Sequence, residues 1–157
     1  MPAATISPIS DARPDTHTIA HPVVRPEAAE AKRLGDEITE LCSYLYAAEA
    51  RLLKRIREFD DKQCWAEQGF HSCAHWLNFK CGIGMNAARE KVRVAKALCD
   101  LPKMEARLAS GELSYSKVRA MTRVANADNE DALLNVAKHG TAHHLSLIHI
   151  SEPTRRH

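Results

Sequence analysis

Apolar residues recur at mostly alternating four- and three-residue steps through the first half of the sequence. The positions are Leu34, Ile38, Leu41, Leu45, Ala48, Leu52, Ile56 and Phe59. This spacing places apolar side chains on one side of an α-helix, at a nearly heptad repeat. Pro26 suits the helix start, and Glu27 and Glu30 suit its first turn, where carboxylates stabilise the helix dipole. The pattern predicts one long helix of about 33 residues, roughly 50 Å in length.

A helix of this length exceeds the width of a small domain, so its apolar side needs a cover. We expect later helices of the same chain to pack along it. The alternative is a protein partner, such as a second copy in a homodimer. The candidate residues for that oligomerisation are Leu34, Ile38, Leu41, Leu45 and Leu52.

Shorter helices follow, each with a residue type that starts or stops a helix. The predicted starts are Ser72, Asn86, Pro102, Ser114 and Asp128. The predicted stops are Gly82, Gly84, Gly111 and Gly140. No stretch alternates with the period of two of a strand, and aromatic residues make up only 5% of the chain, which disfavours sheets. We therefore predict an all-α fold, a multi-helix array led by one long N-terminal helix.

The two ends of the chain differ from this helical part. Residues 1–26 contain five prolines and few large apolar side chains, which predicts a disordered N-terminus. We expect the helical domain over residues 27–144. Residues 145–155 read LSLIHISEPTR, a translation that resembles the transposon end and adapter used in sequencing-library preparation. We interpret residues 145–157 as a non-native tail and expect the native sequence to continue beyond His144.

Cysteine usage and hydropathy bear on the location of the protein. The five cysteines include no C-x-x-C pair, and an odd number without a secretion signal fits free thiols in a reducing cytoplasm. The first 26 residues lack the apolar core of a signal peptide. No stretch approaches the roughly 18 apolar residues of a membrane-spanning helix. We expect a cytoplasmic protein without a membrane anchor.

The net charge of +2 does not by itself indicate a nucleic-acid partner, but the charge is unevenly distributed. Between residues 86 and 123, nine basic residues stand against four acidic ones, a net charge of +5. Arg89, Arg93 and Lys96 fall at i, i+4 and i+7, on one face of a predicted helix. Such a face suits contact with phosphates, which need cations in no particular order. The alternative is an ordinary solvated helix face.

Residues 102–125 read as helix, glycine-containing turn and helix, an order loosely similar to a helix-turn-helix. In a DNA groove, Ser114, Ser116 and Lys117 would lead the second helix. The alternative is an ordinary helical hairpin. The full set of DNA-contact candidates is Arg89, Arg93, Lys96, Lys117, Arg119 and Arg123.

Catalytic and metal-binding chemistry finds little support in the sequence. His71 and His75 are four residues apart, a spacing known from zinc sites, with Cys73 between them. A structural zinc usually needs four ligands, so we expect packed or surface side chains here and no metal. We expect Trp65 and Trp76 in the core rather than stacked on bases. No nucleophile–base pair, phosphate loop or pair of acids is present, and we assign no catalytic residue.

A series of short motifs runs through about residues 35–145 in a fixed order. They are Trp65 and Gly69, Ser72 with Trp76-Leu77, Gly82-Ile83-Gly84, Ala87-Ala88-Arg89, Val92 to Leu98, Leu101-Pro102, Ser110-Gly111-Glu112-Leu113-Ser114 with Lys117, and Ala142-His143-His144-Leu145. Their order and spacing resemble the domain-of-unknown-function family 222, also called the 13E12 repeat family. In this family, frequent among actinobacteria, the helical region commonly precedes a C-terminal HNH nuclease module.

The resemblance implies the N-terminal region of an HNH-endonuclease-like protein. An HNH site uses one histidine to activate water and other groups to hold a divalent metal against the phosphate. No such His-Asn-His arrangement occurs in this sequence, so we expect that metal in the parent's nuclease module and no cofactor in this chain. Our first hypothesis is a non-catalytic region that assists DNA association. The second is a protein-interaction or oligomerisation module without DNA contact.

Overall fold

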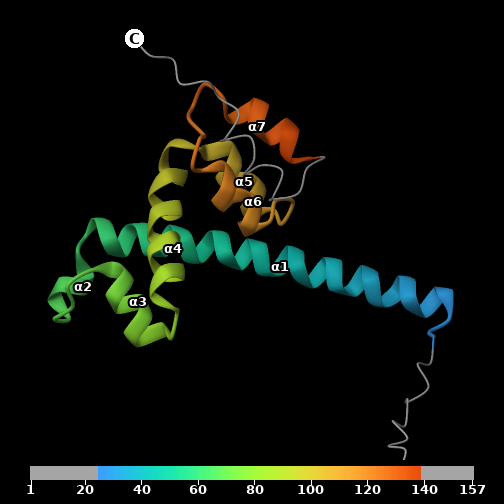
Figure 1. The fold of residues 1–157 in the computed structure, drawn as a ribbon, viewed down its shortest axis with the longest axis horizontal. Helices are drawn as coiled ribbons and strands as arrows, with labels where there is room; N and C mark the ends of the chain where they lie inside the picture. The colour runs from blue at the N-terminus through green and yellow to red at the C-terminus, as the bar shows by residue number, and fades with distance from the viewer. Residues whose placement is uncertain (1–24, 139–157) are drawn as a thin grey trace, which may run out of the picture.

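The computed structural model describes residues 25–138, which contain helices and turns and no strand (Figure 1). The elements are α1 (Ala28–Asp61), α2 (Cys64–Glu67), α3 (Cys73–Cys81), α4 (Met85–Ala97), the 3₁₀ helix η1 (Leu98–Asp100), α5 (Pro102–Ala109), α6 (Tyr115–Met121) and α7 (Glu130–Ala137). The predicted all-α array with one long N-terminal helix is therefore confirmed. Residues 1–24 and 139–157, which hold most of the predicted disordered segment and all of the predicted tail, lie outside the described residues.

The helices after α1 gather around its middle and C-terminal part, and its N-terminal part, where residues 28–41 are all exposed, extends away from them (Figure 1). Helix α4 runs across α1. Helices α2 and α3 lie near the C-terminal end of α1. Helix α5 contacts α1, α6 and α7. The core lies between these elements. Its largest fully buried side chains include Leu53, Val94, Leu98, Met104, Leu108 and Val118.

Two predicted caps and one predicted stop are confirmed. The Ser72 hydroxyl accepts a hydrogen bond from the backbone N–H of His75 at 3.1 Å and caps α3. The Ser114 hydroxyl does the same for α6, accepting from the N–H of Lys117 at 3.3 Å. Gly82 ends α3 in the left-handed region at φ +67°, where an L side chain is strained.

Two predicted helix starts are wrong. Helix α4 begins at Met85 after Gly84, so Asn86 lies inside its first turn and does not cap it. Helix α7 begins at Glu130, because Asp128 belongs to a turn closed by an asparagine side chain. The Asn126 side-chain oxygen accepts hydrogen bonds from the N–H groups of Asp128 and Asn129, each at 3.0 Å. Such a local bond holds the backbone outside the helix.

The turn between α5 and α6 touches the backbone of α1. Gly111 has a φ of +80°, and a Cβ atom there would lie 2.7 Å from the carbonyl oxygen of Ser43. The carbonyl of Arg107 accepts from the N–H groups of Glu112 and Leu113, at 3.0 and 3.1 Å, and closes the turn. Leu113 is buried. Residues 110–114 thus contain the end of α5, the close contact with α1 and the cap of α6.

Helix α5 receives its N-terminal cap from another helix. Its own N-cap residue, Leu101, has no side-chain acceptor. The carboxylate of Glu130 on α7 accepts from the backbone N–H of Met104 at 2.6 Å, and Glu130 is buried. A negative charge at the N-terminus of a helix also stabilises its dipole. This contact ties the last described helix to the core.

The free cysteines differ in their environment, which predicts their reactivity. Burial raises the pKa of the Cys73 thiol to about 11, whereas Cys81 and Cys99 are exposed. The thiolate is the reactive form, so at neutral pH a thiol reagent should modify Cys81 and Cys99 first. Cys73 should react only as fast as the protein opens. Peptide mass spectrometry over time measures this order, and modification of native Cys73 as fast as Cys99 would contradict the packing of α3.

Candidate functional site

Basic side chains of α4 connect this helix to α1. Lys91 forms a largely buried ion pair with Glu49, and its ammonium group lies 4.4 Å from the ring centroid of Tyr115. Lys96 pairs with the mostly buried carboxylate of Asp60 at 2.6 Å. Lys96, predicted to contact DNA, therefore faces α1.

Arg93 connects α4 to the end of α6. It pairs with Glu90 at 3.0 Å on its own helix. It also donates to the carbonyl of Arg119 at 3.1 Å and to the hydroxyl of Thr122 at 3.3 Å. The last carbonyls of a helix lack intrahelical partners, and a cation stabilises them. Arg93 thus acts as a C-terminal cap for α6, supplied by α4.

Lys117 makes a similar contact one helix further along the chain. Its ammonium group donates to the carbonyl of Ala137, the last residue of α7, at 2.7 Å. The Ser114 hydroxyl is occupied as the cap of α6. The first turn of α6 therefore commits two of its leading polar groups to internal bonds. This arrangement fits the ordinary helical hairpin better than a helix that reads a DNA groove.

Two of the predicted arginines pair with one carboxylate. Glu90 pairs with Arg93 and, at 2.9 Å, with Arg123. The hydrogen bond from Arg93, with the charges of Arg123 and Arg119, holds the pKa of Glu90 below its usual value. Arg89 lies one turn before Arg93 on α4. We call Arg89, Arg93, Arg119 and Arg123 the arginine cluster.

The arginine cluster keeps a net positive charge. Its four guanidinium groups outnumber the one carboxylate, Glu90, that pairs with two of them. Arg89 and Arg119 are exposed, and their side chains have no hydrogen bond or ion pair within residues 25–138. Of the six predicted DNA-contact residues, four thus lie on α4, on α6 or in the turn after α6, whereas Lys96 pairs with Asp60 of α1 and Lys117 donates to a carbonyl of α7.

The residues that hold these cations in place were not predicted. The three-residue spacing of Glu90 from Arg93 is a local signal for an ion pair along a helix. The partners Asp60 and Glu49 lie far away in the sequence. No local pattern would have identified them.

The apolar side of α1 is exposed over most of its length, and the expectation that later helices cover it is wrong for the described residues. The exposed fractions are 42% for Leu34, 61% for Ile38 and Leu41, 66% for Leu45 and 39% for Leu52. The helix packs through Ala50 and Leu53, which lie outside this apolar series, and through Ile56, which belongs to its C-terminal end. Neighbouring positions lie about 100° apart around a helix, so Leu45 and the half-buried Tyr46 face different directions.

Histidine and tryptophan side chains have packing roles. The rings of His71 and His75 are stacked, with centroids 5.9 Å apart. Between residues 25 and 138 no group of three or more His, Cys, Asp or Glu residues could hold a metal ion. Trp65 and Trp76 pack against the core, and their indole N–H groups donate to Asp60 and Gln68.

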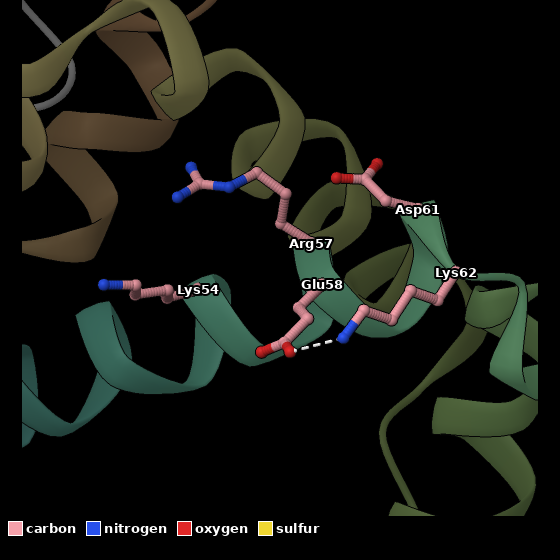
Figure 2. A pocket seen from close by; sticks show the side chains of 5 residues that line it. All are labelled: Lys54, Arg57, Glu58, Asp61 and Lys62. Atoms are coloured by element: carbon pink, nitrogen blue, oxygen red, sulfur yellow. Dashed lines mark hydrogen bonds and ion pairs between the residues drawn. The ribbon is translucent and has the colours of Figure 1, made fainter.

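An open surface hollow at the C-terminal end of α1 contains only charged side chains (Figure 2). They are Lys54, Arg57, Glu58, Asp61 and Lys62. Lys62 pairs with Glu58 at 2.8 Å and, together with Arg55, lowers the pKa of that carboxyl. Arg57 is engaged with Glu105 at 3.2 Å. The five side chains that line the hollow include no histidine, cysteine or hydroxyl group, so no nucleophile–base pair lies there.

Comparison with known proteins places this arrangement in a family. The family model "Domain of unknown function (DUF222)" matches residues 28–155, which include every described helix. The match also includes most of residues 145–157, whose non-native origin stays a prediction. Comparisons with curated proteins and with solved structures found no match. No helix between residues 25 and 138 is long and apolar enough to cross a membrane. Because the match spans most of its length, the chain belongs to the DUF222 family.

Proposed function

We propose that this chain is the non-catalytic helical region of a cytoplasmic, HNH-endonuclease-like protein and that it assists DNA association through the arginine cluster. The observation that carries the proposal is that four arginines of α4, of α6 and of the turn after α6 have only Glu90 as an ion-pair partner within residues 25–138. The link to a nuclease rests on the resemblance of the sequence motifs. The divalent metal of HNH chemistry would belong to the parent's nuclease module.

The geometry of the arginine cluster suits phosphate groups. Glu90 fixes Arg93 and Arg123, and Arg93 is fixed further by the end of α6. Arg89 precedes Arg93 by one helical turn, Arg119 precedes Arg123 by four residues, and both are exposed. Guanidinium groups bind phosphate oxygens through pairs of parallel hydrogen bonds, and these two arginines have no internal partner within residues 25–138 that competes for them. We expect contacts to the backbone without preference for a base sequence.

Replacing the two exposed arginines tests this role. We expect Arg89→Ala combined with Arg119→Ala to weaken binding to a labelled DNA duplex by about ten-fold or more at low salt, because two phosphate contacts are lost. Fluorescence anisotropy measures the affinity. Both side chains are exposed and without an internal partner in the described residues, so circular dichroism should show an unchanged fold.

A matched control removes the same charge elsewhere. Arg33 and Arg55 are exposed on α1, and each pairs only with a nearby glutamate of that helix. Arg33→Ala combined with Arg55→Ala should leave the affinity within about two-fold, since surface ion pairs of this kind contribute little to the fold. Equal losses of DNA affinity in the two double variants would show that only the total charge matters. No binding by the wild type would overturn the proposal.

A second candidate function is favoured by the exposed side of α1. Contiguous exposed apolar positions on a long helix are typical of a protein-interaction site. Five such positions, Leu34, Ile38, Leu41, Leu45 and Leu52, are at least 39% exposed. We therefore keep an interaction or oligomerisation role for α1 beside DNA association, and the two roles use different helices.

A further inference from the structure

We propose that α1 pairs with α1 of a second copy of this chain in an antiparallel coiled coil. We call Leu34, Ile38, Leu41, Leu45, Ala48 and Leu52 the apolar stripe. The inference rests on the interaction role proposed for α1 and adds the partner, the orientation and the register. Four separate observations carry it: spacing, side-chain size, charge and shape.

The spacing of the apolar stripe is that of a coiled-coil seam. Its steps alternate strictly between four and three residues from Leu34 to Leu52, and the next step, to Ile56, breaks the alternation. The break falls where α1 enters the core, because Leu53 and Ile56 are buried. A strict alternation keeps the seam facing a partner helix. The seam therefore runs for roughly 27 Å along α1.

Side-chain size favours the antiparallel orientation. With Leu41 opposite the partner's Leu45, the register also sets Leu34 opposite Leu52 and Ile38 opposite Ala48. Every layer then contains at least one large side chain. A parallel pair would set Ala48 against Ala48 and leave a gap at that layer, and unfilled space in an apolar interface is destabilising.

Charges beside the apolar stripe favour the same orientation. In the antiparallel register, Glu37 lies beside the partner's Arg51, and the symmetry of the dimer forms this pair twice. Arg51 is exposed with no ion pair within residues 25–138, and Glu37 is exposed and paired only with Arg33 of its own helix. In a parallel pair, Glu37 would lie beside Cys42 and gain no opposite charge. Flanking charges of this kind set the orientation of coiled coils.

The shape of the described part of the chain accommodates this arrangement. Helices α2 to α7 gather around the middle and the C-terminal part of α1, and residues 28–41 of α1 are exposed throughout (Figure 1). In an antiparallel pair, the helices of each copy lie beside the bare N-terminal part of the other. In a parallel pair, both groups of helices lie at the same end of the coiled coil, where they compete for space.

The first experiment asks whether the apolar stripe forms a dimer. Light scattering of the full chain, of 17.5 kDa, should give twice that mass. Leu45→Asp should return the mass to that of one chain with unchanged circular dichroism, because Leu45 is already 66% exposed. Phe79→Asp is the control, since Phe79 is 72% exposed on α3 and should leave the dimer intact. A monomeric wild type, or a dimer that survives Leu45→Asp, would overturn self-pairing through the apolar stripe.

The second experiment asks for the orientation. In a variant that carries Cys42→Ser, Cys64→Ser, Cys81→Ser and Cys99→Ser, the changes Leu34→Cys and Leu52→Cys are introduced in separate chains. The antiparallel register predicts a disulfide-linked dimer in the mixture of the two chains and little in either chain alone. Linkage in each chain alone, and in the mixture only between identical chains, would show a parallel pair. That outcome would overturn the orientation while leaving the interaction role of α1 intact, whereas a monomer would remove the support for self-association altogether.

Discussion

Gly111→Ala is expected to lower the free energy of unfolding by about 3–4 kcal/mol, since two effects add. The backbone at Gly111 has a φ of +80°, which costs a residue with a Cβ atom about 1–2 kcal/mol. The added Cβ would also meet the carbonyl oxygen of Ser43 at 2.7 Å. That oxygen belongs to the backbone of α1, so relief requires the turn and the helix to separate. Urea denaturation followed by circular dichroism measures the loss.

Gly82→Ala separates the two effects. Gly82 has a φ of +67°, and nothing lies within 4 Å of a Cβ atom there. Its replacement should cost only the backbone strain, about 1–2 kcal/mol. A loss at Gly111 no larger than that at Gly82 would show that the turn between α5 and α6 does not press against α1 as described.

The second large effect is expected at Glu130. Glu130→Ala should lower the free energy of unfolding by about 2–3 kcal/mol, because the N–H of Met104 would be left without an acceptor in a buried place. Glu130→Gln should cost about 1 kcal/mol, since an amide oxygen can still accept the bond but the charge at the start of α5 is gone. Chemical denaturation of the two variants measures both values.

The neighbouring residue provides the control. Asp131 is exposed and pairs with Lys103, which is also exposed, so Asp131→Ala should change the free energy of unfolding by less than about 0.5 kcal/mol. If Glu130→Ala were as mild as Asp131→Ala, the capping of α5 by α7 would not hold.

Local signals were the part of the fold that the sequence could predict. Heptad spacing predicted α1, and the hydroxyl groups of Ser72 and Ser114 predicted the starts of α3 and α6. These signals work because the interacting groups lie within one or two turns of each other. At Asn126 a side-chain hydrogen bond within a turn competes with the helix, so the local signals predicted the start of α7 at the wrong residue.

Contacts between distant residues were not predictable in the same way. Glu130 caps α5, Arg93 caps α6 and Lys117 caps α7, each from another helix. The order of acidic and basic residues does not show which of them form ion pairs. The basic stretch therefore predicted a positive charge but not the contacts that its side chains make. Gly111 was predicted to break a helix, but its close approach to α1 depends on how the helices pack.

Several basic residues of α4 have a structural role. Lys91 and Lys96 join α4 to α1, and Arg93 joins it to α6. Cations used in this way contribute to the fold first. The charge that remains for a polyanion is concentrated in the arginine cluster, above all in Arg89 and Arg119.

The dependence of DNA binding on salt tests that remaining charge most directly. Release of counterions makes the logarithm of the binding constant fall linearly with the logarithm of the salt concentration, by about 0.9 for each phosphate contacted. Anisotropy titrations of the wild type over a series of salt concentrations should give a slope of about −2 to −4, for roughly two to four contacts. No binding at low salt, or a slope near zero, would contradict an association carried by the arginine cluster.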